Sequence, residues 1–463
     1  MGSPEELVAR LVSALPREVL VTDPDVMEGF CHDEAEWAPY GKPLAVVRAR
    51  STDDVTRVVQ ACAATRTPLV TRGAGTGLSG GANATDGCVV LSTERMTAIR
   101  RIDRANMVAV VEPGVINDDL RQACAEQGLW YPPDPASYQI STIGGNVATN
   151  AGGLCCLKYG VTRDYVLALE VVLASGTVVR LGSPTRKNSA GYDLRALIVG
   201  SEGTLGIVTE VTLRLLSLPP TAPVTVVGFF ATLVAAGDAV ARITAAGIVP
   251  AVLELVDQHC LRAVDDWKRM ELDVDAAVLL LGRVDTPGAA GDAEADAVLS
   301  AFSAAGATGA LRSDDEATSE ALFAARRLAY PALERLGPLL TEDVCVPRSL
   351  MADMLSAIQA AGQRHDVTIA NIAHAGDGNL HPLLMVPAGD DDARRRAQLA
   401  FDDILAAALA LGGTVSGEHG VGLLKRDGLA RQVGPDVLAL YAAVKRSLDP
   451  AGILNPGKVI AAD

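Results

Sequence analysis

The segment that most restricts the fold is RGAGTGLSGGAN at 72–83, a glycine-rich loop that follows a predicted strand at Pro68–Thr71. It contains the pattern G-x-G-x-x-G at Gly75, Gly77 and Gly80, which is typical of dinucleotide-binding Rossmann folds. In those folds a helix begins near the third glycine and meets the pyrophosphate with its N-terminus. Here GGANATDG follows, and its glycine, asparagine, threonine and aspartate disfavour a helix. The sequence therefore indicates a glycine loop of phosphate size outside a Rossmann fold.

Two more glycine-dense segments lie in the same half of the chain, STIGGNVATNAGG at 141–153 and VGSEGTLGIVT at 199–209. Glycine lacks a Cβ atom, so successive backbone N–H groups can turn toward one anion. A single such loop could be only a tight turn. Three of them indicate one large anionic cofactor that lies across all three.

The charge balance limits what else the chain can bind. Its 463 residues include 40 basic and 56 acidic side chains, a formal net charge of −16. Nucleic acids and anionic lipids require basic surface, so this balance argues against both. We expect local backbone dipoles or a few cations to hold an anionic ligand.

The eight cysteines are scattered and form no C-x-x-C pair, which is typical of reduced thiols and predicts a cytoplasmic protein. The first residues, MGSPEELVARL, lack the basic region of a signal peptide. We expect no transmembrane segment, because no apolar run reaches spanning length. Association with a membrane surface and a homodimer are both compatible with the sequence.

Local signals predict several elements. Ser51–Ala64 reads as a helix capped by Ser51 or Thr52, and Asn117–Gln127 as a helix capped by Asn117. Two β-rich runs flank Ser175-Gly176 and predict a hairpin. Pro219, Pro220 and Pro223 indicate a domain boundary, beyond which alanine-rich helices alternate with apolar strands.

Two of the six histidines lie in HAGDGNLHP at 374–382. Asp377-Gly378 predicts a two-residue hairpin turn, which would pair His374 directly with His381. Directly opposed residues have Cβ atoms about 4.5–5.5 Å apart, so both imidazoles could bind one divalent ion.

A third histidine lies in SGEHGVGLLKR at 416–426. Glu418 could supply a third ligand, giving the His-His-Glu set with open positions of a catalytic metal site. The alternative for each motif is a hydrogen-bonded structural histidine. Both motifs together favour a metal.

A candidate substrate anchor lies in ALFAARRLAYPAL at 321–333, a predicted helix with Arg326 and Tyr330 on one face. A guanidinium suits a bidentate contact with a carboxylate, although most helix arginines are solvated.

The glycine segments, with KNSAGYDLRALIVGSEGTLGIVTE at 187–210, resemble the FAD-binding domain of vanillyl-alcohol-oxidase-type flavoproteins. From about 43 to 459 the chain resembles the FAD-linked D-2-hydroxyacid dehydrogenases, a family that includes glycolate oxidase catalytic subunits and D-lactate dehydrogenases. The resemblance implies an α+β fold, with a two-subdomain FAD-binding domain and an α+β substrate (cap) domain built on an antiparallel sheet. The implied parts are an N-terminal helical segment at 1–40, the FAD-binding domain at 41–219, the cap domain at 220–415, and a segment at 416–463 that returns to complete the active site.

The resemblance also implies the contacts of FAD. Residues Arg72–Ala82 would wrap the pyrophosphate, and the C-terminal tail would return to the flavin. Covalent members often have a histidine in the first loop, where this chain has Thr76, so we expect noncovalent FAD. The implied FAD-binding residues are Arg72, Gly73, Ala74, Gly75, Thr76, Gly77, Ser79, Gly80, Pro133, Asp134, Ser141, Thr142, Gly144, Gly145, Asn146, Ala148, Asn150, Ala151, Gly152, Gly153, Gly200, Glu202, Gly203, Ile207, Val208, Asn455 and Lys458.

The same resemblance implies the catalytic groups. It makes His374, His381 and Glu418 ligands of one divalent metal, usually zinc and in some members manganese. It makes His419 the base, and Arg326, with Tyr330 beside it, the group that binds the substrate carboxylate.

The implied reaction is the oxidation of a small D-2-hydroxy acid to the 2-oxo acid, with hydride transfer to flavin N5. An alcohol with a pKa near 16 must lose its proton to a histidine near 6.5, a gap of roughly nine units that a divalent ion can narrow.

The substrate and the class of protein have alternatives. In the 2-hydroxyglutarate branch a lysine and an asparagine hold the second carboxylate, and here Thr341 and Leu383 stand there, which favours D-lactate or glycolate. The other classes are a metal-dependent hydrolase and a noncatalytic FAD-binding subunit. Oxygen, a quinone, a cytochrome and an iron–sulfur partner subunit all stay open as electron acceptor.

Overall fold

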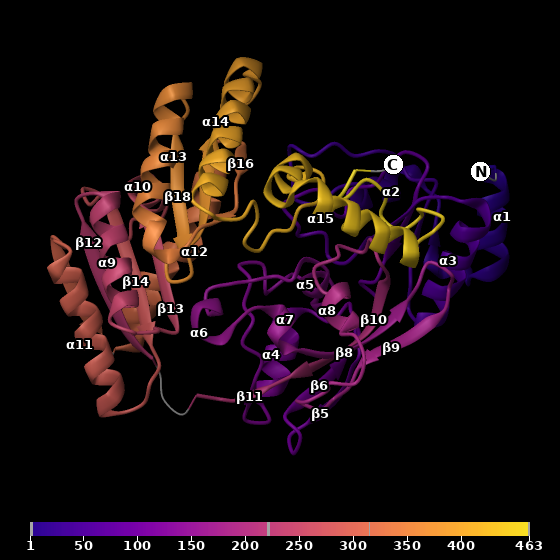
Figure 1. Ribbon diagram of the computed structural model, residues 1–463, viewed down its shortest axis with the longest axis horizontal. Coiled ribbons are helices and arrows are strands. Elements are labelled where there is room, and N and C mark those ends of the chain that lie inside the picture. The colour runs from indigo at the N-terminus through magenta and orange to yellow at the C-terminus, as the bar shows by residue number, and fades with distance from the viewer. Residues whose placement is uncertain (1–2, 220–222, 314, 462–463) are drawn as a thin grey trace. The chain divides into compact units, whose positions relative to one another are not determined.

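The computed structural model describes residues 3–219, 223–313 and 315–461. These residues form two compact units, and each contains separate stretches of the chain (Figure 1). The first unit comprises Met1–Gly152, Val161–Leu218 and Glu418–Asp463, and the second comprises Gly153–Gly160 and Pro219–Gly417. Pro220, one of the three prolines of the predicted boundary, lies outside the described residues. Among the helices described, none combines the length and the apolar character needed to cross a bilayer.

A small sheet with parallel central strands forms one part of the first unit. Its strands are, in spatial order, β1 (Leu20–Val21), β2 (Ala45–Arg48), β4 (Val89–Ser92) and β3 (Leu69–Arg72). Helices α1 (Pro4–Ala14) and α3 (Thr52–Thr65) pack against each other and share its apolar core. The predicted start of α3 is confirmed, because Ser51 Oγ accepts a hydrogen bond from Asp54 N at 3.2 Å.

A five-stranded antiparallel sheet forms the other part. Its order is β5 (Ile99–Asp103), β6 (Val108–Val111), β10 (Ile207–Arg214), β8 (Val166–Val172) and β9 (Val178–Gly182). The predicted hairpin at Ser175-Gly176 is confirmed, since Val172 pairs with Val178. A separate two-stranded pair joins β7 (Leu129–Trp130) and β11 (Leu216–Ser217).

Besides α1 and α3, the helices of the first unit include α2 (Pro24–Met27), α4 (Asn117–Ala125), α5 (Ile143–Thr149), α7 (Thr162–Tyr165), α8 (Leu194–Ile198) and α15 (Arg426–Leu448). Two of them, α4 and α5, correct predictions. Ile116, not Asn117, is the N-cap of α4, because the buried Asn117 amide donates instead to Asn146 Oδ1 at 2.9 Å. The glycine segment at 141–153 is not only a loop: it contains α5, whose cap is Thr142.

The second unit is built on an eight-stranded sheet, which is antiparallel as the family resemblance implied. Its order is β15 (Gly309–Ser313), β12 (Val224–Phe230), β14 (Val278–Val284), β13 (Val252–Asp257), β18 (Ile369–His374), β19 (Asn379–Met385) and β16 (Leu339–Thr341), with β17 (Val344–Cys345) also paired to β19.

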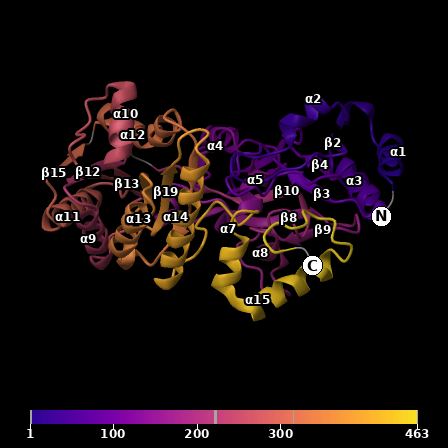
Figure 2. The ribbon, with the colours of Figure 1, turned by 90° about the horizontal axis from the view of Figure 1, so that it is seen from above.

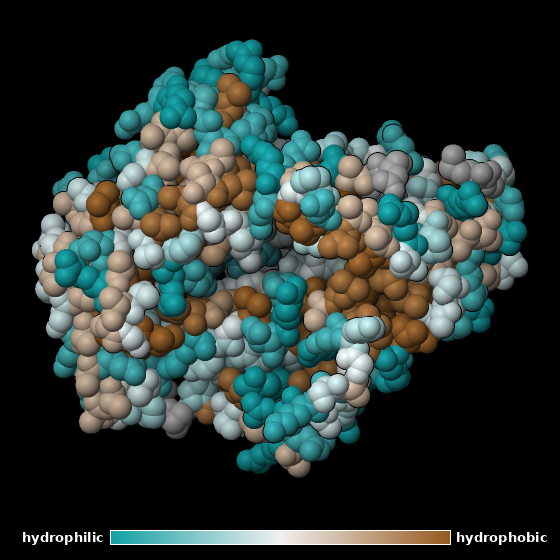
Figure 3. All heavy atoms as spheres, viewed as in Figure 1, coloured by the Kyte–Doolittle hydropathy of each residue, from teal (hydrophilic) through white to brown (hydrophobic). Residues whose placement is uncertain are grey.

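Helices cover both faces of this sheet (Figure 2). One layer contains α10 (Gln258–Lys268) and α12 (Glu316–Glu334), whose apolar residues share a core with the central strands. The other contains α9 (Leu233–Ala245), α11 (Ala289–Ala304), α13 (Met351–His365) and α14 (Asp391–Ala410). The projecting ends of α13 and α14 are mainly hydrophilic (Figure 3). The short α6 (Cys156–Tyr159) also belongs to this unit, where Lys158 and Tyr159 both bind the Asp285 carboxylate.

Candidate active site

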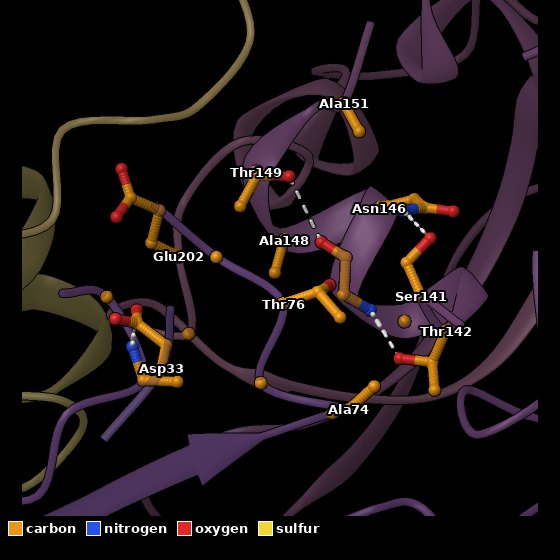
Figure 4. Close-up of a pocket in the computed structure, with 18 of the residues that line it drawn as sticks. Asp33, Ala74, Thr76, Ser141, Thr142, Asn146, Ala148, Thr149, Ala151 and Glu202 are labelled. Carbon is orange, nitrogen blue, oxygen red and sulfur yellow. Dashed lines mark hydrogen bonds between the residues drawn. The ribbon is translucent and has the colours of Figure 1, made fainter. Parts of the chain in front are cut away.

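The three glycine segments predicted from the sequence converge on one cavity of the first unit (Figure 4). Glu418 and His419 also line this cavity, so the C-terminal stretch returns to the glycine loops within this unit. The other lining residues predicted from the sequence are Gly73, Ala74, Gly75, Thr76, Gly77, Ser79, Ser141, Thr142, Gly144, Gly145, Asn146, Ala148, Ala151, Gly152, Glu202, Gly203, Ile207 and Val208.

Side chains on α5 shape one wall of the cavity. Thr142 Oγ1 accepts a hydrogen bond from Gly145 N at 3.2 Å, and Thr149 Oγ1 donates to Gly145 O at 3.2 Å. Asn146 Nδ2 donates to Ser141 Oγ at 3.2 Å (Figure 4). This wall is therefore polar, and its geometry is fixed by bonds that involve side chains.

Two glycines allow the close packing of this wall and the conformation of the first loop. A Cβ atom at Gly144 would stand 2.5 Å from Pro113 Cβ, so only glycine lets α5 approach that segment. Gly75 has φ +81°, a conformation that L side chains rarely adopt. The cavity thus presents backbone where a phosphate chain needs close approach, and its residues fit FAD.

Asp33, which the sequence analysis missed, lies with Glu202 on the opposite wall (Figure 4). Its side chain accepts hydrogen bonds from Ala35 N at 3.1 Å and Ala82 N at 3.3 Å. Burial raises the pKa of Asp33. An isolated aspartate in the N-terminal segment has no motif around it, so the sequence carried no signal that Asp33 would line the cavity.

Glu202 ties the C-terminal stretch to the cavity. Its carboxylate accepts hydrogen bonds from Val421 N at 2.7 Å and Gly422 N at 2.8 Å, just after His419. Burial raises the pKa of Glu202 to about 7, although these two bonds oppose that shift. Ser79 Oγ adds a second tie, donating to Gly420 O at 2.9 Å. In this segment Glu418 Oε1 and His419 Nε2 are 3.9 Å apart.

Asn455 and Lys458, predicted beside the flavin, are not among the residues that line the cavity. Instead they support the first glycine loop. The Asn455 amide donates to Gly81 O and to Glu202 O, both at 2.8 Å, and Lys458 Nζ donates to Asn83 O at 2.8 Å. Burial lowers the pKa of Lys458 to about 8.

Other predicted FAD residues also lie next to the lining rather than in it. Asn150 ends α5, and its Oδ1 accepts a hydrogen bond from Arg163 N at 2.9 Å. Pro133 O accepts from Asn117 Nδ2 at 3.2 Å, and Pro135 lines the cavity instead. The predicted residues absent from the lining are Arg72, Gly80, Pro133, Asp134, Asn150 and Gly200, and Gly153 belongs to the second unit.

In the second unit the histidine hairpin has a different register from the predicted one. His374 pairs with Asn379, and Ile372 with His381, so the turn spans four residues rather than two. A two-residue turn would also pair Gly376 with Asn379, but the Gly376 N–H donates to Leu253 O of β13 at 3.1 Å. The two histidines are diagonal neighbours on one face, and their ring centroids are 5.1 Å apart. The predicted convergence of the rings is therefore present despite the wrong register.

A buried carboxylate, Glu254 on β13, connects two of the predicted site residues. Its Oε1 lies 2.7 Å from His374 Nδ1, and its Oε2 accepts a hydrogen bond from Arg326 Nε at 2.7 Å. Burial alone would raise the pKa of Glu254, but His374 and Arg326 outweigh burial and lower it. Arg326 is thus not a solvated helix arginine, since it is 9% exposed.

Further residues of the second unit surround these groups. Thr341 Oγ1 donates to the Tyr330 hydroxyl at 3.5 Å. Asp343 is completely buried, with its Oδ1 3.7 Å from His381 Nδ1. Its Oδ2 accepts hydrogen bonds from Ser416 Oγ at 2.7 Å and Gly417 N at 3.0 Å. Glu254 and Asp343 escaped the sequence analysis, although a charge inside an apolar strand such as VLELV is the kind of signal that could have found Glu254.

Comparison with protein families divides the chain into two matches. Residues 43–182 match an FAD binding domain, and residues 219–459 match the C-terminal domain of FAD linked oxidases. The second match alone covers more than half of the chain.

Curated relatives extend over nearly the whole chain. This chain is 43% identical to the glycolate oxidase subunit GlcD of Bacillus subtilis (strain 168) over 422 residues, which is 91% of this chain and 90% of that one. It is 36% identical to the D-lactate dehydrogenase of Anaerostipes hadrus over 471 residues, which is 98% of this chain and 97% of that one.

Solved structures agree on the fold. A p-cresol methylhydroxylase with bound substrate superposes with a TM-score of 0.82 at 19% identity, over 99% of this chain and 97% of that one. A 4-ethylphenol oxidase from Gulosibacter chungangensis superposes with a TM-score of 0.79 at 19% identity, over 100% of this chain and 98% of that one. The fold is therefore the vanillyl-alcohol-oxidase type that the family resemblance implied. The chain belongs to the FAD-linked oxidases and is an FAD-linked oxidoreductase of the group that contains glycolate oxidase subunits and D-lactate dehydrogenases.

Proposed function

We propose that this enzyme oxidises a small D-2-hydroxy acid, D-lactate or glycolate, to the 2-oxo acid, using noncovalent FAD and one divalent metal. The observation that carries the substrate class is the similarity to relatives named for glycolate and D-lactate, at 43% and 36% identity over most of the chain. The metal ligands would be His374, His381 and Glu418, and zinc is the favoured ion.

FAD, when bound, supplies a two-electron acceptor, and a divalent ion, when bound, supplies a Lewis acid that eases loss of the hydroxyl proton. His419 accepts that proton as general base. It is suited to this role because it lines the same cavity as the glycine segments.

Arg326 would hold the substrate carboxylate. Its Nε is engaged with Glu254, which fixes the plane of the guanidinium and leaves the side chain oriented for a planar anion. Tyr330, on the same helix, would complete this anchor.

The second unit favours a substrate with one carboxylate. Leu383 is completely buried in the apolar core and pairs with Thr341 across β16 and β19. These positions hold neither the cation nor the amide that would bind the second carboxylate of 2-hydroxyglutarate most strongly.

Anaerobic reduction of the purified enzyme by D-lactate, L-lactate, glycolate and D-2-hydroxyglutarate tests the proposal. We expect D-lactate or glycolate to bleach the blue flavin absorbance fastest. Treatment with EDTA should slow the bleaching, and Zn²⁺ or Mn²⁺ should restore it. A correctly folded protein without flavin absorbance, or reduction by L-lactate faster than by D-lactate and glycolate, would contradict the proposal. Unchanged rates after metal removal would contradict the metal.

A further inference from the structure

We propose that Glu254 is a positioning residue that orients a metal ligand and the substrate anchor at the same time. This inference rests on the proposed function, because it takes His374 as a metal ligand and Arg326 as the carboxylate anchor. It adds a residue that neither the sequence motifs nor the family resemblance contains.

The geometry of Glu254 is that of a bridge. It lies on β13, one residue from the pair that Leu255 forms with Ala373 of β18, and His374 follows Ala373 on that strand. Arg326 comes from α12, on the helix layer that packs against this sheet. One carboxylate oxygen contacts His374 Nδ1 and the other contacts Arg326 Nε, both at 2.7 Å.

The bridge determines which nitrogen of His374 can bind a metal. A carboxylate beside Nδ1 favours the proton on that atom, so the lone pair of the ring lies on Nε2. Carboxylates that accept from a ligating histidine fix its tautomer and ring orientation, and their loss typically weakens metal binding about 10–100-fold.

The same carboxylate constrains Arg326. Glu254 has no exposed surface, so water cannot reach its carboxylate and take over the hydrogen bond to Arg326. With one edge of the guanidinium held by Glu254, the remaining N–H groups keep a fixed direction. Glu254 would thus set the distance and angle between His374, which would hold the metal, and Arg326, which would hold the substrate carboxylate.

The experiment compares Glu254→Gln and Glu254→Asp with the wild-type holoenzyme. Zn²⁺ affinity is measured by competition with a chromophoric chelator, and kcat and KM are measured at saturating Zn²⁺ with the better of D-lactate and glycolate. We expect Zn²⁺ affinity to fall 10–100-fold in Glu254→Gln, with a rise of KM of tenfold or more that exceeds the fall in kcat. Glu254→Asp should recover part of the Zn²⁺ affinity because it keeps the charge. Bound FAD should stay unchanged.

Two control variants separate positioning from stability. Leu255→Ala removes a fully buried neighbour on the same strand, and it should lower the thermal stability without changing Zn²⁺ affinity. Glu320→Gln removes a carboxylate that pairs with Arg283 and with Arg327, next to Arg326, and it should leave Zn²⁺ affinity and KM unchanged.

The outcomes are distinct. If the wild type binds Zn²⁺ and Glu254→Gln has the same affinity and KM, the role of Glu254 is wrong while the proposed function stands. If the wild type does not bind Zn²⁺ or Mn²⁺, the metal of the proposed function and this role are both wrong.

Discussion

His419 is the residue on which the proposed proton transfer depends. It lines the cavity of the first unit, and its own segment is held there by Glu202 and Ser79. His419→Asn should keep the fold and the bound FAD, because the ties to that segment use other residues.

Without the base, anaerobic flavin reduction by substrate should slow about 10²–10⁴-fold, as measured by stopped-flow absorbance. His259→Asn, at an exposed histidine on α10, is the matched control and should reduce at the wild-type rate. Equal rates for His419→Asn and the wild type would refute the assigned base.

Glu202 makes stability depend on pH. Its pKa is about 7 in the folded chain against 4.5 for an unperturbed glutamate, so between these values the folded state binds more protons than the unfolded state. The contribution of Glu202 to the free energy of unfolding is therefore largest below about pH 4.5 and falls as pH rises through about 7, by up to about 3 kcal/mol.

Urea unfolding of the wild type and Glu202→Gln at pH 5 and pH 8 measures this effect. The free energy of unfolding of the wild type minus that of the variant should be smaller at pH 8. A difference that stays constant between the two pH values would show that Glu202 does not titrate in this range.

At the residue scale the sequence predicted the groups that lie in motifs and missed those that do not. The glycines of the first loop, Glu418 and His419 stand in dense local patterns. Glu254 meets its partners Arg326 and His374 across 72 and 120 positions of the chain. No local spacing encodes such a contact, because only the assembled sheet brings the three side chains together.

Helix α5 shows how one element depends on close packing. In Gly144→Ala the new Cβ would overlap Pro113, so either α5 or that segment must move. We expect a loss of about 1–3 kcal/mol in the free energy of unfolding. FAD affinity should also fall, because α5 carries one wall of the cavity.

Gly29→Ala is the control for this change, since a Cβ atom there meets nothing within 4 Å. Chemical denaturation and flavin fluorescence titration measure the two effects. If Gly144→Ala matched Gly29→Ala in both, the close approach of α5 would not matter.

The elements themselves were predictable where a cap or a turn marks them. The start of α3 followed from Ser51, and the hairpin of β8 and β9 followed from Ser175-Gly176. The histidine hairpin was placed in the wrong register because a third strand competes for its turn: Gly376 N–H bonds to Leu253 O. Such competition depends on the order of strands in the sheet, which local periodicity does not contain.

At the scale of the whole molecule, the family resemblance implied the division into an FAD-binding domain and a cap domain, but neither it nor local pattern predicted the order of strands. In the second sheet, β13 lies between β14 and β18, whose sequences are far apart along the chain.

The split of the first unit into three stretches has a direct consequence for stability. Ile453 and Leu454 are buried in its core, and Leu69 N–H donates to Ile453 O at 2.7 Å.

A chain that ends at Gly417 should therefore fail to form a stable first unit. Loss of two buried aliphatic side chains costs about 3–6 kcal/mol, a large part of the 5–15 kcal/mol typical of a domain. Limited proteolysis and FAD content measure the defect, and supplying 418–463 as a separate peptide should restore part of both. A truncated chain that keeps FAD and resists protease would contradict this account.

The shared core of Leu69 and Leu454 also affects the order in which the two units can fold during translation. The ribosome makes β3 long before Ile453 and Leu454, which complete the core around that strand. During translation the core of the first unit stays incomplete until its last stretch is made. The second unit can fold earlier, because nearly all of it comes from one continuous stretch. Chaperone protection of the nascent chain would then matter most for the half that binds the flavin.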